Sequence, residues 1–261
     1  MSRLRGPVNL KCKAPRYPIH VEILTGTSGY SYKEWVGPFY PDKTPASAML
    51  RYYAERFPTV EINNTFYRMP DTTLLERWAS EVPEGFVFTL KAPQRITHMK
   101  RLKGVAPDVA EFTRRAAVLG DRLGMLLFQL PPTLRKDLPR LHDLLGALPP
   151  ERCVAVEFRH DSWQDDEVYE TLRARGAALC VVEDDEDGVS PFVCTSDCAY
   201  LRLRRTQYTE SDLRAWADRI RVQPLARAYV YFKHGDEALA PRYARQLDEL
   251  WHAPTAKDSG Q

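Results

Sequence analysis

Several short apolar runs end in charged side chains. Where one run carries two such charges, they are two residues apart. In the run 153–159, Cys-Val-Ala-Val-Glu-Phe-Arg, Glu157 and Arg159 share one phase, and apolar residues fill the other. The run 86–91 ends in Lys91 in the same way. Alternate residues of a strand point to opposite faces, so each set of charges belongs to one face of its strand. Burying an unpaired charge is costly, so convergent charges of this kind indicate a functional site.

The same alternation puts polar residues at the ends of most of the other runs. These residues, in chain order, are Ser28, Glu61, Asn63, Gln129, Arg202, Arg204 and Lys233. Two loop residues that follow the second and third runs, Tyr67 and His98, complete the set of expected ligand contacts. A site built from so many separate runs requires a fold that brings their ends together.

Arginine in this pattern suits the binding of an anion. The planar guanidinium groups of Arg159, Arg202 and Arg204 match the geometry of carboxylate and phosphate groups. Lys91 and Lys233 add two further cations in the same phase. We therefore expect the site to bind a multiply charged anion, with Arg202 at its centre.

Catalysis in this site would fall to Glu61, Glu157 and Lys91, with His98 as a further acid–base group. We expect an enzyme that acts on a phosphorylated or otherwise anionic small molecule or a nucleotide, of open reaction class. Two alternatives stay open. The charges would merely neutralise each other, as in a Glu61–Lys91 pair, or the two carboxylates would serve a glycosidase, whose carboxylate separation the sequence does not give.

Eight apolar runs, which alternate with helical patterns, must position these residues. The runs are Val21–Thr25, Thr59–Ile62, Phe86–Leu90, Met125–Leu130, Cys153–Phe158, Ala178–Val182, Tyr200–Leu203 and Ala228–Phe232. Strands that alternate with helices form parallel βαβ units. Eight such units within about 230 residues predict an α/β fold, a closed TIM-type (β/α) barrel. The link 183–199 has no helical pattern, so an irregular barrel or one with seven regular strands is the alternative.

The two phases of each strand predict which side faces the barrel interior. The bulky set Phe86, Phe88 and Leu90 should meet the ring of helices, as should Val154 and Val156. Active sites of such barrels lie at the C-terminal ends of the strands, where the polar residues fall. We therefore expect one end of the barrel to gather Glu61, Lys91, Gln129, Glu157, Arg159 and Arg202.

Composition fits one cytoplasmic domain. We expect a loosely ordered, proline-rich leader at 1–20, a single barrel domain at 21–252 and a flexible tail at 253–261. The 37 basic and 35 acidic residues nearly balance, which argues against a dedicated nucleic-acid binder. No stretch approaches the ~20 apolar residues of a membrane span. Residues 1–20 contain no apolar core of a secretion signal.

The cysteines favour a reducing compartment. Their number is odd, and no two of them form a C-x-x-C motif; they are Cys12, Cys153, Cys180, Cys194 and Cys198. We expect all five to be free thiols, with Cys153 and Cys180 packed within strands.

A rival function uses the loop 95–103, which carries Arg95, His98, Lys100, Arg101 and Lys103 and no acidic residue. This loop would serve a non-catalytic module that binds nucleic acid or a protein partner. Metal signals are weak: the acidic run 183–187 is typical of a solvated loop, and Cys194 and Cys198 have no matching second pair. We therefore expect no metal and no cofactor.

Several motifs resemble the signatures of the YecE-like family, also called domain of unknown function 72. They are Gly26-Thr-Ser-Gly-Tyr-Ser-Tyr32, Trp35, Gly37-Pro-Phe-Tyr-Pro41, Val60-Glu-Ile-Asn-Asn-Thr-Phe-Tyr-Arg68, Ile96-Thr-His98, Gln129-Leu-Pro-Pro132 and Val156-Glu-Phe-Arg-His160 with Trp163. The resemblance runs from about Ile23 to about Leu250. It implies a TIM-barrel-type fold with no established activity.

Two strand ends depart from that family's pattern. The seventh strand commonly ends Arg-Leu-His-Gly, whereas this chain has Arg202-Leu-Arg-Arg205. The eighth commonly ends Tyr-Phe-Asn-Asn, whereas this chain has Tyr231-Phe-Lys-His234. Both changes introduce cations, so they predict a more electropositive site and leave the family's ligand preference in doubt.

Overall fold

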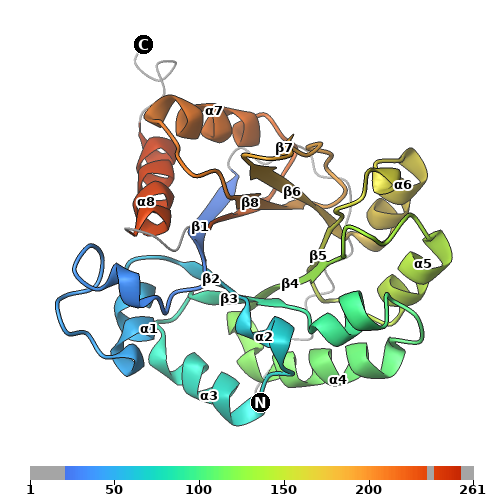
Figure 1. Cartoon of the computed structure of the whole chain (residues 1–261), viewed down its shortest axis with the longest axis horizontal. Helices are drawn as coiled ribbons and strands as arrows, with labels where there is room; N and C mark the ends of the chain where they lie inside the picture. The colour runs from blue at the N-terminus through green and yellow to red at the C-terminus, as the bar shows by residue number, and fades with distance from the viewer. Residues whose placement is uncertain (1–20, 234–237, 254–261) are drawn as a thin grey trace, which may run out of the picture.

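Eight parallel strands close into a barrel, with helices around it (Figure 1). The computed structural model describes residues 21–233 and 238–253. The strands are β1 Glu22–Ser28, β2 Thr59–Ile62, β3 Val87–Lys91, β4 Leu123–Gln129, β5 Val154–Glu157, β6 Ala178–Asp184, β7 Gly188–Val189, β8 Cys198–Leu203 and β9 Arg227–Phe232. The eight parallel strands follow one another around the barrel in chain order, and pairing of β9 with β1 closes it. The predicted barrel is confirmed.

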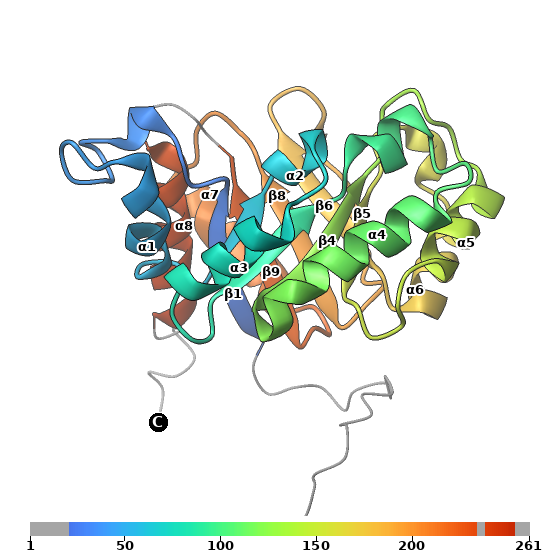
Figure 2. The ribbon, with the colours of Figure 1, turned by 90° about the horizontal axis from the view of Figure 1, so that it is seen from below.

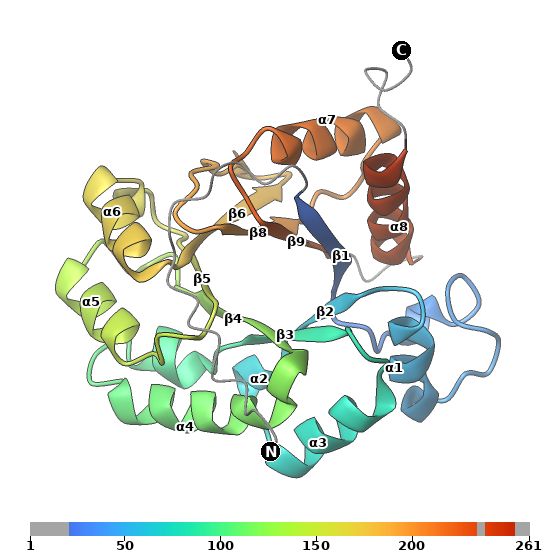
Figure 3. The same cartoon turned by 180° about the vertical axis from the view of Figure 1, so that it is seen from behind.

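Helices follow the strands and form the outer ring, as the view from behind shows (Figure 3). The α-helices are α1 Ala46–Ala54, α2 Asn64–Tyr67, α3 Thr72–Glu81, α4 Ala106–Ala116, α5 Leu138–Gly146, α6 Asp166–Arg175, α7 Glu210–Arg221 and α8 Leu239–His252. Shorter turns are η1 Lys33–Trp35, η2 Arg95–Met99, η3 Ala117–Arg122 and η4 Asp161–Trp163. From the side, the short helix α2 lies at the edge of the barrel where β2 ends (Figure 2).

The link 183–199 contains no helix, as its sequence predicts. Instead β6 turns back as β7, which pairs antiparallel with it through Glu183 and Val189. The neighbouring strands β5 and β6 pair at only two positions, Ala155 with Ala178 and Val156 with Leu179. The pairing between β5 and β6 is therefore short, and it lies next to the β6–β8 link that has no helix.

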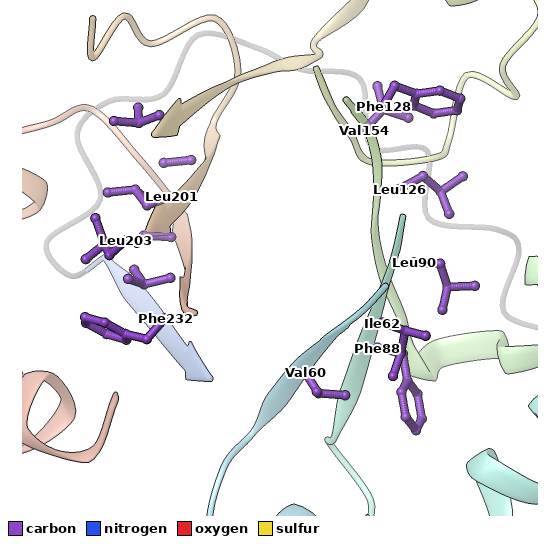
Figure 4. Packing of buried hydrophobic residues seen from close by; sticks show 14 of the residues in the cluster. Val60, Ile62, Phe88, Leu90, Leu126, Phe128, Val154, Leu201, Leu203 and Phe232 are labelled. Atoms are coloured by element: carbon purple, nitrogen blue, oxygen red, sulfur yellow. The ribbon is translucent and has the colours of Figure 1, made fainter. Parts of the chain in front are cut away.

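Two separate cores hold the fold together. The larger core lies between strands and helices and includes Phe86, Phe88, Leu90, Val154 and Val156, so the predicted outward phase is confirmed. Figure 4 shows several of these side chains on the outer side of the strands. A second, inner core fills the barrel with Leu24, Met125, Leu127, Ala155, Cys180, Tyr200, Tyr229 and Tyr231. This inner core forms a solid floor beneath the polar strand ends.

Two local features depend on particular residues. Gly26 lies where β1 approaches β2 most closely, and a Cβ there would meet the carbonyl oxygen of Thr59 at 2.2 Å. Asp71 caps the N-terminus of α3, because its side chain accepts hydrogen bonds from the backbone of Thr73 and Leu74. One prediction is wrong. Cys153 precedes β5 and is exposed rather than packed within the strand.

Candidate functional site

Arg202 lies at the centre of the polar end of the barrel, which we call the mouth. Its Nη2 donates to Glu61 Oε1 at 2.9 Å, and its Nη1 donates to Glu157 Oε2 at 2.6 Å. These three side chains come from β8, β2 and β5, and all are almost completely buried. The guanidinium therefore joins two carboxylates from well-separated strands. The predicted convergence of Glu61, Glu157 and Arg202 on one end of the barrel is confirmed.

Glu61 is held by a shell of donors. Besides Arg202, its carboxylate accepts hydrogen bonds from Tyr200 at 2.7 Å, Ser28 at 2.7 Å and Asn63 at 2.9 Å. Burial alone would raise the pKa of Glu61, but Arg202 and the hydroxyl donors reverse the effect and lower it. The sequence predicted Ser28 and Asn63 as ligand contacts, and here both bind a protein carboxylate.

Glu157 is held in a similar way. Gln129 Nε2 donates to its Oε1 at 2.7 Å, and Arg159 Nε donates to the same oxygen at 3.0 Å. Arg204 Nη2 lies 3.7 Å from that oxygen and 3.5 Å from Asp184 Oδ2. Although burial opposes ionisation, Arg202, Arg204 and Arg159 hold the pKa of Glu157 well below its usual range. Both carboxylates are therefore ionised at neutral pH.

Lys91 differs from the other charged groups of the mouth. It is 8% exposed, and its Nζ lies 4.1 Å from the centre of the Phe66 ring. Among residues 21–233 and 238–253, no carboxylate oxygen lies within 4.0 Å of that Nζ. Burial and the nearby Arg202 lower the pKa of Lys91 to about 8, against the partial compensation from Glu61 and Glu157. The sequence left open an ion pair between Glu61 and Lys91. The structure does not contain this pair, because Glu61 binds Arg202 instead.

Positive charge exceeds negative charge in the mouth. Within the described residues the cations are Lys91, Arg159, Arg202, Arg204 and Lys233, and the carboxylates are Glu61, Glu157 and Asp184. Desolvation, Arg202 and Arg204 lower the pKa of Lys233. Desolvation, Lys91 and Arg159 lower the pKa of His98. These groups thus share one electropositive environment, although they come from four different strand ends.

A cavity of about 890 Å³ opens where β5 and β6 separate. Arg159, Arg204 and His160 line it together with acidic residues, which are Glu157, Asp161, Asp184, Glu186 and Asp187, whereas Lys91 is not among the lining residues. Within residues 21–233 and 238–253, the buried Nε atoms of Arg202 and Arg204 have no hydrogen-bond partner. Such an unmade hydrogen bond costs roughly 1–3 kcal/mol, so these donors mark positions where an acceptor would be favoured.

Tyr67 is 74% exposed, and its ring packs only against Phe66 among the described aromatic side chains.

Most of the Arg and Lys side chains of the loop 95–103 bind neighbouring segments of the protein. Asp108 forms ion pairs with Arg95 at 2.7 Å and with Lys100 at 2.5 Å, and Arg101 donates to Thr133. Its cations are thus partly neutralised by an acid that lies just beyond the loop.

Some residues of the site were not predicted. Tyr200 donates a hydrogen bond to Glu61, the Phe66 ring packs against Lys91, and Asp184 pairs with Arg204. Tyr200 precedes Arg202 by two residues, so its phase was a usable signal. Asp184 belongs to the acidic run taken for a solvated loop, whereas in fact it ends β6 beside the mouth.

The donors present do not form a metal site. In the parts of the chain that the structure describes, no three His, Cys, Asp or Glu side chains are grouped to hold an ion.

Cys153, Cys180, Cys194 and Cys198 are free thiols, whereas Cys12 lies outside the described residues. None of the helices in the described chain combines the length and the apolar character needed to cross a bilayer.

The fold and the mouth define a TIM-type barrel with a charged, buried cluster at the C-terminal strand ends. The chain belongs to the DUF72 family, because the family described as "Protein of unknown function DUF72" matches residues 24–260. The crystal structure of a DUF72 family protein from Thermotoga maritima MSB8 is 30% identical, with a TM-score of 0.79 over 89% of this chain and 100% of that one.

Two further relatives are similar to parts of this chain or to its fold. The UPF0759 protein YunF of Bacillus subtilis is 29% identical over 184 residues, which span 64% of this chain and 62% of that protein. A DUF72 family protein from Enterococcus faecalis V583 is 17% identical, with a TM-score of 0.74 over 89% of this chain and 96% of that one. At that identity the likeness concerns the fold alone.

Proposed function

We propose that the protein is an enzyme that binds a phosphorylated or otherwise anionic small molecule, such as a nucleotide, in the mouth of the barrel. The observation that carries this proposal is the excess of cations over carboxylates in the mouth, where Lys91 and Arg202 are buried and Arg159 and Lys233 are exposed. Lys91 has no carboxylate partner within 4.0 Å among the described residues, and cations outnumber carboxylates in the same space. Uncompensated charge in a desolvated site favours the binding of a counter-ion.

Different cations have different parts in this proposal. Arg202 is already bound to two carboxylates and is almost completely buried, so it fixes the base of the site. Arg159 and Arg204 line the cavity, and 35% of the Arg159 side chain is exposed. The anion contacts therefore fall mainly to Arg159 and Arg204 rather than to Arg202.

Proton transfer fits Lys91 better than the carboxylates. A general acid or base works best when its pKa is near the working pH. Arg202 lowers the pKa of both Glu61 and Glu157, which makes each a weak base and leaves neither protonated. A glycosidase needs one protonated carboxyl group, so this geometry does not favour that reaction. The pKa of Lys91, about 8, is close to neutrality.

The size of the cavity suits a small ligand. Ligand pockets usually enclose about 300–1,000 Å³, and the volume here is about 890 Å³. The stacked rings of Phe158 and Trp163, 4.6 Å apart, form part of its wall. A phosphorylated metabolite or a nucleoside monophosphate fits these limits.

Thermal unfolding at matched ionic strength tests the proposal. Phosphate, sulfate or a nucleoside monophosphate should raise the melting temperature more than chloride does. A ligand at 100 times its dissociation constant adds about 2.7 kcal/mol. Arg159→Gln should lose most of this stabilisation, whereas Arg245→Gln, on the exposed face of α8, should keep it. Equal protection by chloride, or an unchanged response of Arg159→Gln, would refute the proposal.

The rival function, a nucleic-acid- or protein-binding module that uses the loop 95–103, has less support. Asp108 pairs with both Arg95 and Lys100, and Arg101 donates to Thr133, so three of the four Arg and Lys side chains of the loop already have a partner in the protein. Salt-dependent binding of oligonucleotides that is lost in Lys103→Gln but kept in Arg159→Gln would favour the rival.

A further inference from the structure

Lys91 is a buried amine in the mouth, within electrostatic range of Arg202 and Arg159. It ends β3, and its backbone carbonyl oxygen accepts a hydrogen bond from Thr65 Oγ at 2.6 Å, which fixes the strand end. Its Nζ lies over the face of Phe66, 4.1 Å from the ring centre. No hydrogen bond to a described side chain or backbone atom holds that Nζ. The amine is therefore positioned by packing alone, and its lone pair is available when it is deprotonated.

Burial is the main influence that favours the neutral form of Lys91, and the charged groups around it act in both directions. Arg202 on β8 and Arg159 after β5 repel the ammonium ion, and Glu61 on β2 and Glu157 on β5 attract it. Burial and the ammonium charge of Lys91 both lower the pKa of His98 on η2. Both carboxylates are already bound to Arg202, so burial and repulsion outweigh their attraction. At pH 7 a lysine with a pKa of about 8 has a neutral fraction about 300-fold larger than one at 10.5.

We propose that Lys91 is a nucleophile that forms a Schiff base with an aldehyde or ketone carrying a carboxylate or phosphate group. This inference rests on the proposed function, because Arg159 and Arg204 would bind the anionic group and place the carbonyl carbon near the amine. Buried, unpaired lysines are the usual form of Schiff-base lysines, since burial keeps the amine neutral and reactive. An exposed lysine such as Lys103 has no such environment.

The step balances without an oxidant, a reductant or a cofactor. The neutral Lys91 amine attacks the carbonyl carbon, a C–N bond forms as the C=O π bond breaks, and a proton passes from the nitrogen to the former carbonyl oxygen. The resulting carbinolamine loses that oxygen as water, with a second proton supplied by an acid, and a protonated iminium ion remains. The net change converts one ammonium ion and one carbonyl group to one iminium ion and one water. The iminium nitrogen keeps the positive charge, and this charge can stabilise an adjacent carbanion.

Reductive trapping tests this inference on the full chain. We would incubate the protein with pyruvate or glycolaldehyde phosphate, add sodium cyanoborohydride to reduce the iminium, and map the adduct among the ten lysines by peptide mass spectrometry. Acetaldehyde serves as a carbonyl probe without an anionic group. Lys91→Met removes the amine, and Lys103→Met is the matched control on an exposed lysine. The adduct can be mapped on the natural chain alone, so the test does not depend on how the variants fold.

We expect pyruvate or glycolaldehyde phosphate to modify Lys91 on the order of ten-fold faster than Lys103, less than the neutral fraction alone would give because access is restricted. The rate should rise through pH 8 and then level off, and phosphate should slow it. Modification of Lys91 no faster than Lys103 by either anionic probe would overturn the inference, even if phosphate still stabilises the protein. Trapping at Lys91 that is equally fast with acetaldehyde and insensitive to phosphate would support the amine chemistry but refute the proposed function.

Discussion

The buried ammonium group of Lys91 should lower the free energy of unfolding by an amount that can be measured. The folded protein lowers the pKa of this lysine from 10.5 to about 8. Each pKa unit corresponds to about 1.4 kcal/mol, so the protonated side chain destabilises the folded state by about 3 kcal/mol. Lys91→Met keeps a side chain of similar length beside Phe66 and removes the charge. At pH 7 we therefore expect Lys91→Met to be more stable than the natural chain by about 3 kcal/mol.

The pH dependence of this gain follows from the two pKa values. Below pH 8 the lysine is protonated in both the folded and the unfolded chain, so the whole cost is present. Between pH 8 and pH 10.5 the unfolded chain binds more protons than the folded one, so the natural protein gains stability as the pH rises. Above pH 10.5 both states are neutral, and the advantage of Lys91→Met should disappear.

Urea unfolding of the natural chain, Lys91→Met and Lys103→Met at pH 7 and pH 10 measures this difference. Lys103 is exposed, so Lys103→Met should match the natural chain at both values. A loss of stability in Lys91→Met at pH 7, or an equal gain at both pH values, would refute the reasoning. Functional residues often cost stability in this way, because the property that makes them reactive is unfavourable in the folded state.

Three further predictions concern other groups of the molecule. Arg202→Met leaves Glu61 and Glu157 buried without their shared partner, so it should lower the free energy of unfolding by about 3–5 kcal/mol, measured in urea at pH 7; a loss below about 1 kcal/mol would contradict the geometry. Glu157→Gln should be less stable than the natural chain at pH 7, and the deficit should shrink as the pH falls below 4.5, because the pKa of Glu157 is lowered by folding; a constant deficit down to pH 2 would argue against it. Exposed Cys153, whose pKa a hydrogen bond from Cys198 lowers to about 7, should react with iodoacetamide before the other described cysteines, and Cys198→Ala should slow that reaction.

The sequence predicted the barrel because short apolar runs alternate with helical patterns along the chain, and strand phase predicted which side chains face the interior. The set Phe86, Phe88 and Leu90 packs against helices, and the set ending in Lys91 faces the interior. The missing helix after β6 was also visible, since 183–199 has no helical pattern. Strand phase and the rule that barrel sites lie at C-terminal strand ends were sufficient for the location of the site.

Pairing within the mouth could not be predicted, because it depends on distances across the barrel. Glu61 and Glu157 come from strands that are not neighbours, yet both bind Arg202. This single contact moves the expected ligand contacts from Arg202 to Arg159 and Arg204, and it leaves Lys91 without a carboxylate. Phase places a side chain inside the barrel, but side-chain length and reach decide which charges meet there. The commitment of Arg95 to Asp108, thirteen residues later in the chain, was hidden for the same reason.

The titration of Lys91 itself tests the central claim most directly, that the mouth holds a buried cation which awaits an anion. With lysine labelled at the ε-carbon, the NMR shift of Lys91, assigned through Lys91→Met, can be followed against pH with and without phosphate at constant ionic strength. We expect a midpoint near pH 8 in chloride, and a higher midpoint in phosphate, because a bound anion stabilises the ammonium form. A midpoint near 10.5 in both buffers, or one near 8 that phosphate leaves unchanged, would contradict the claim.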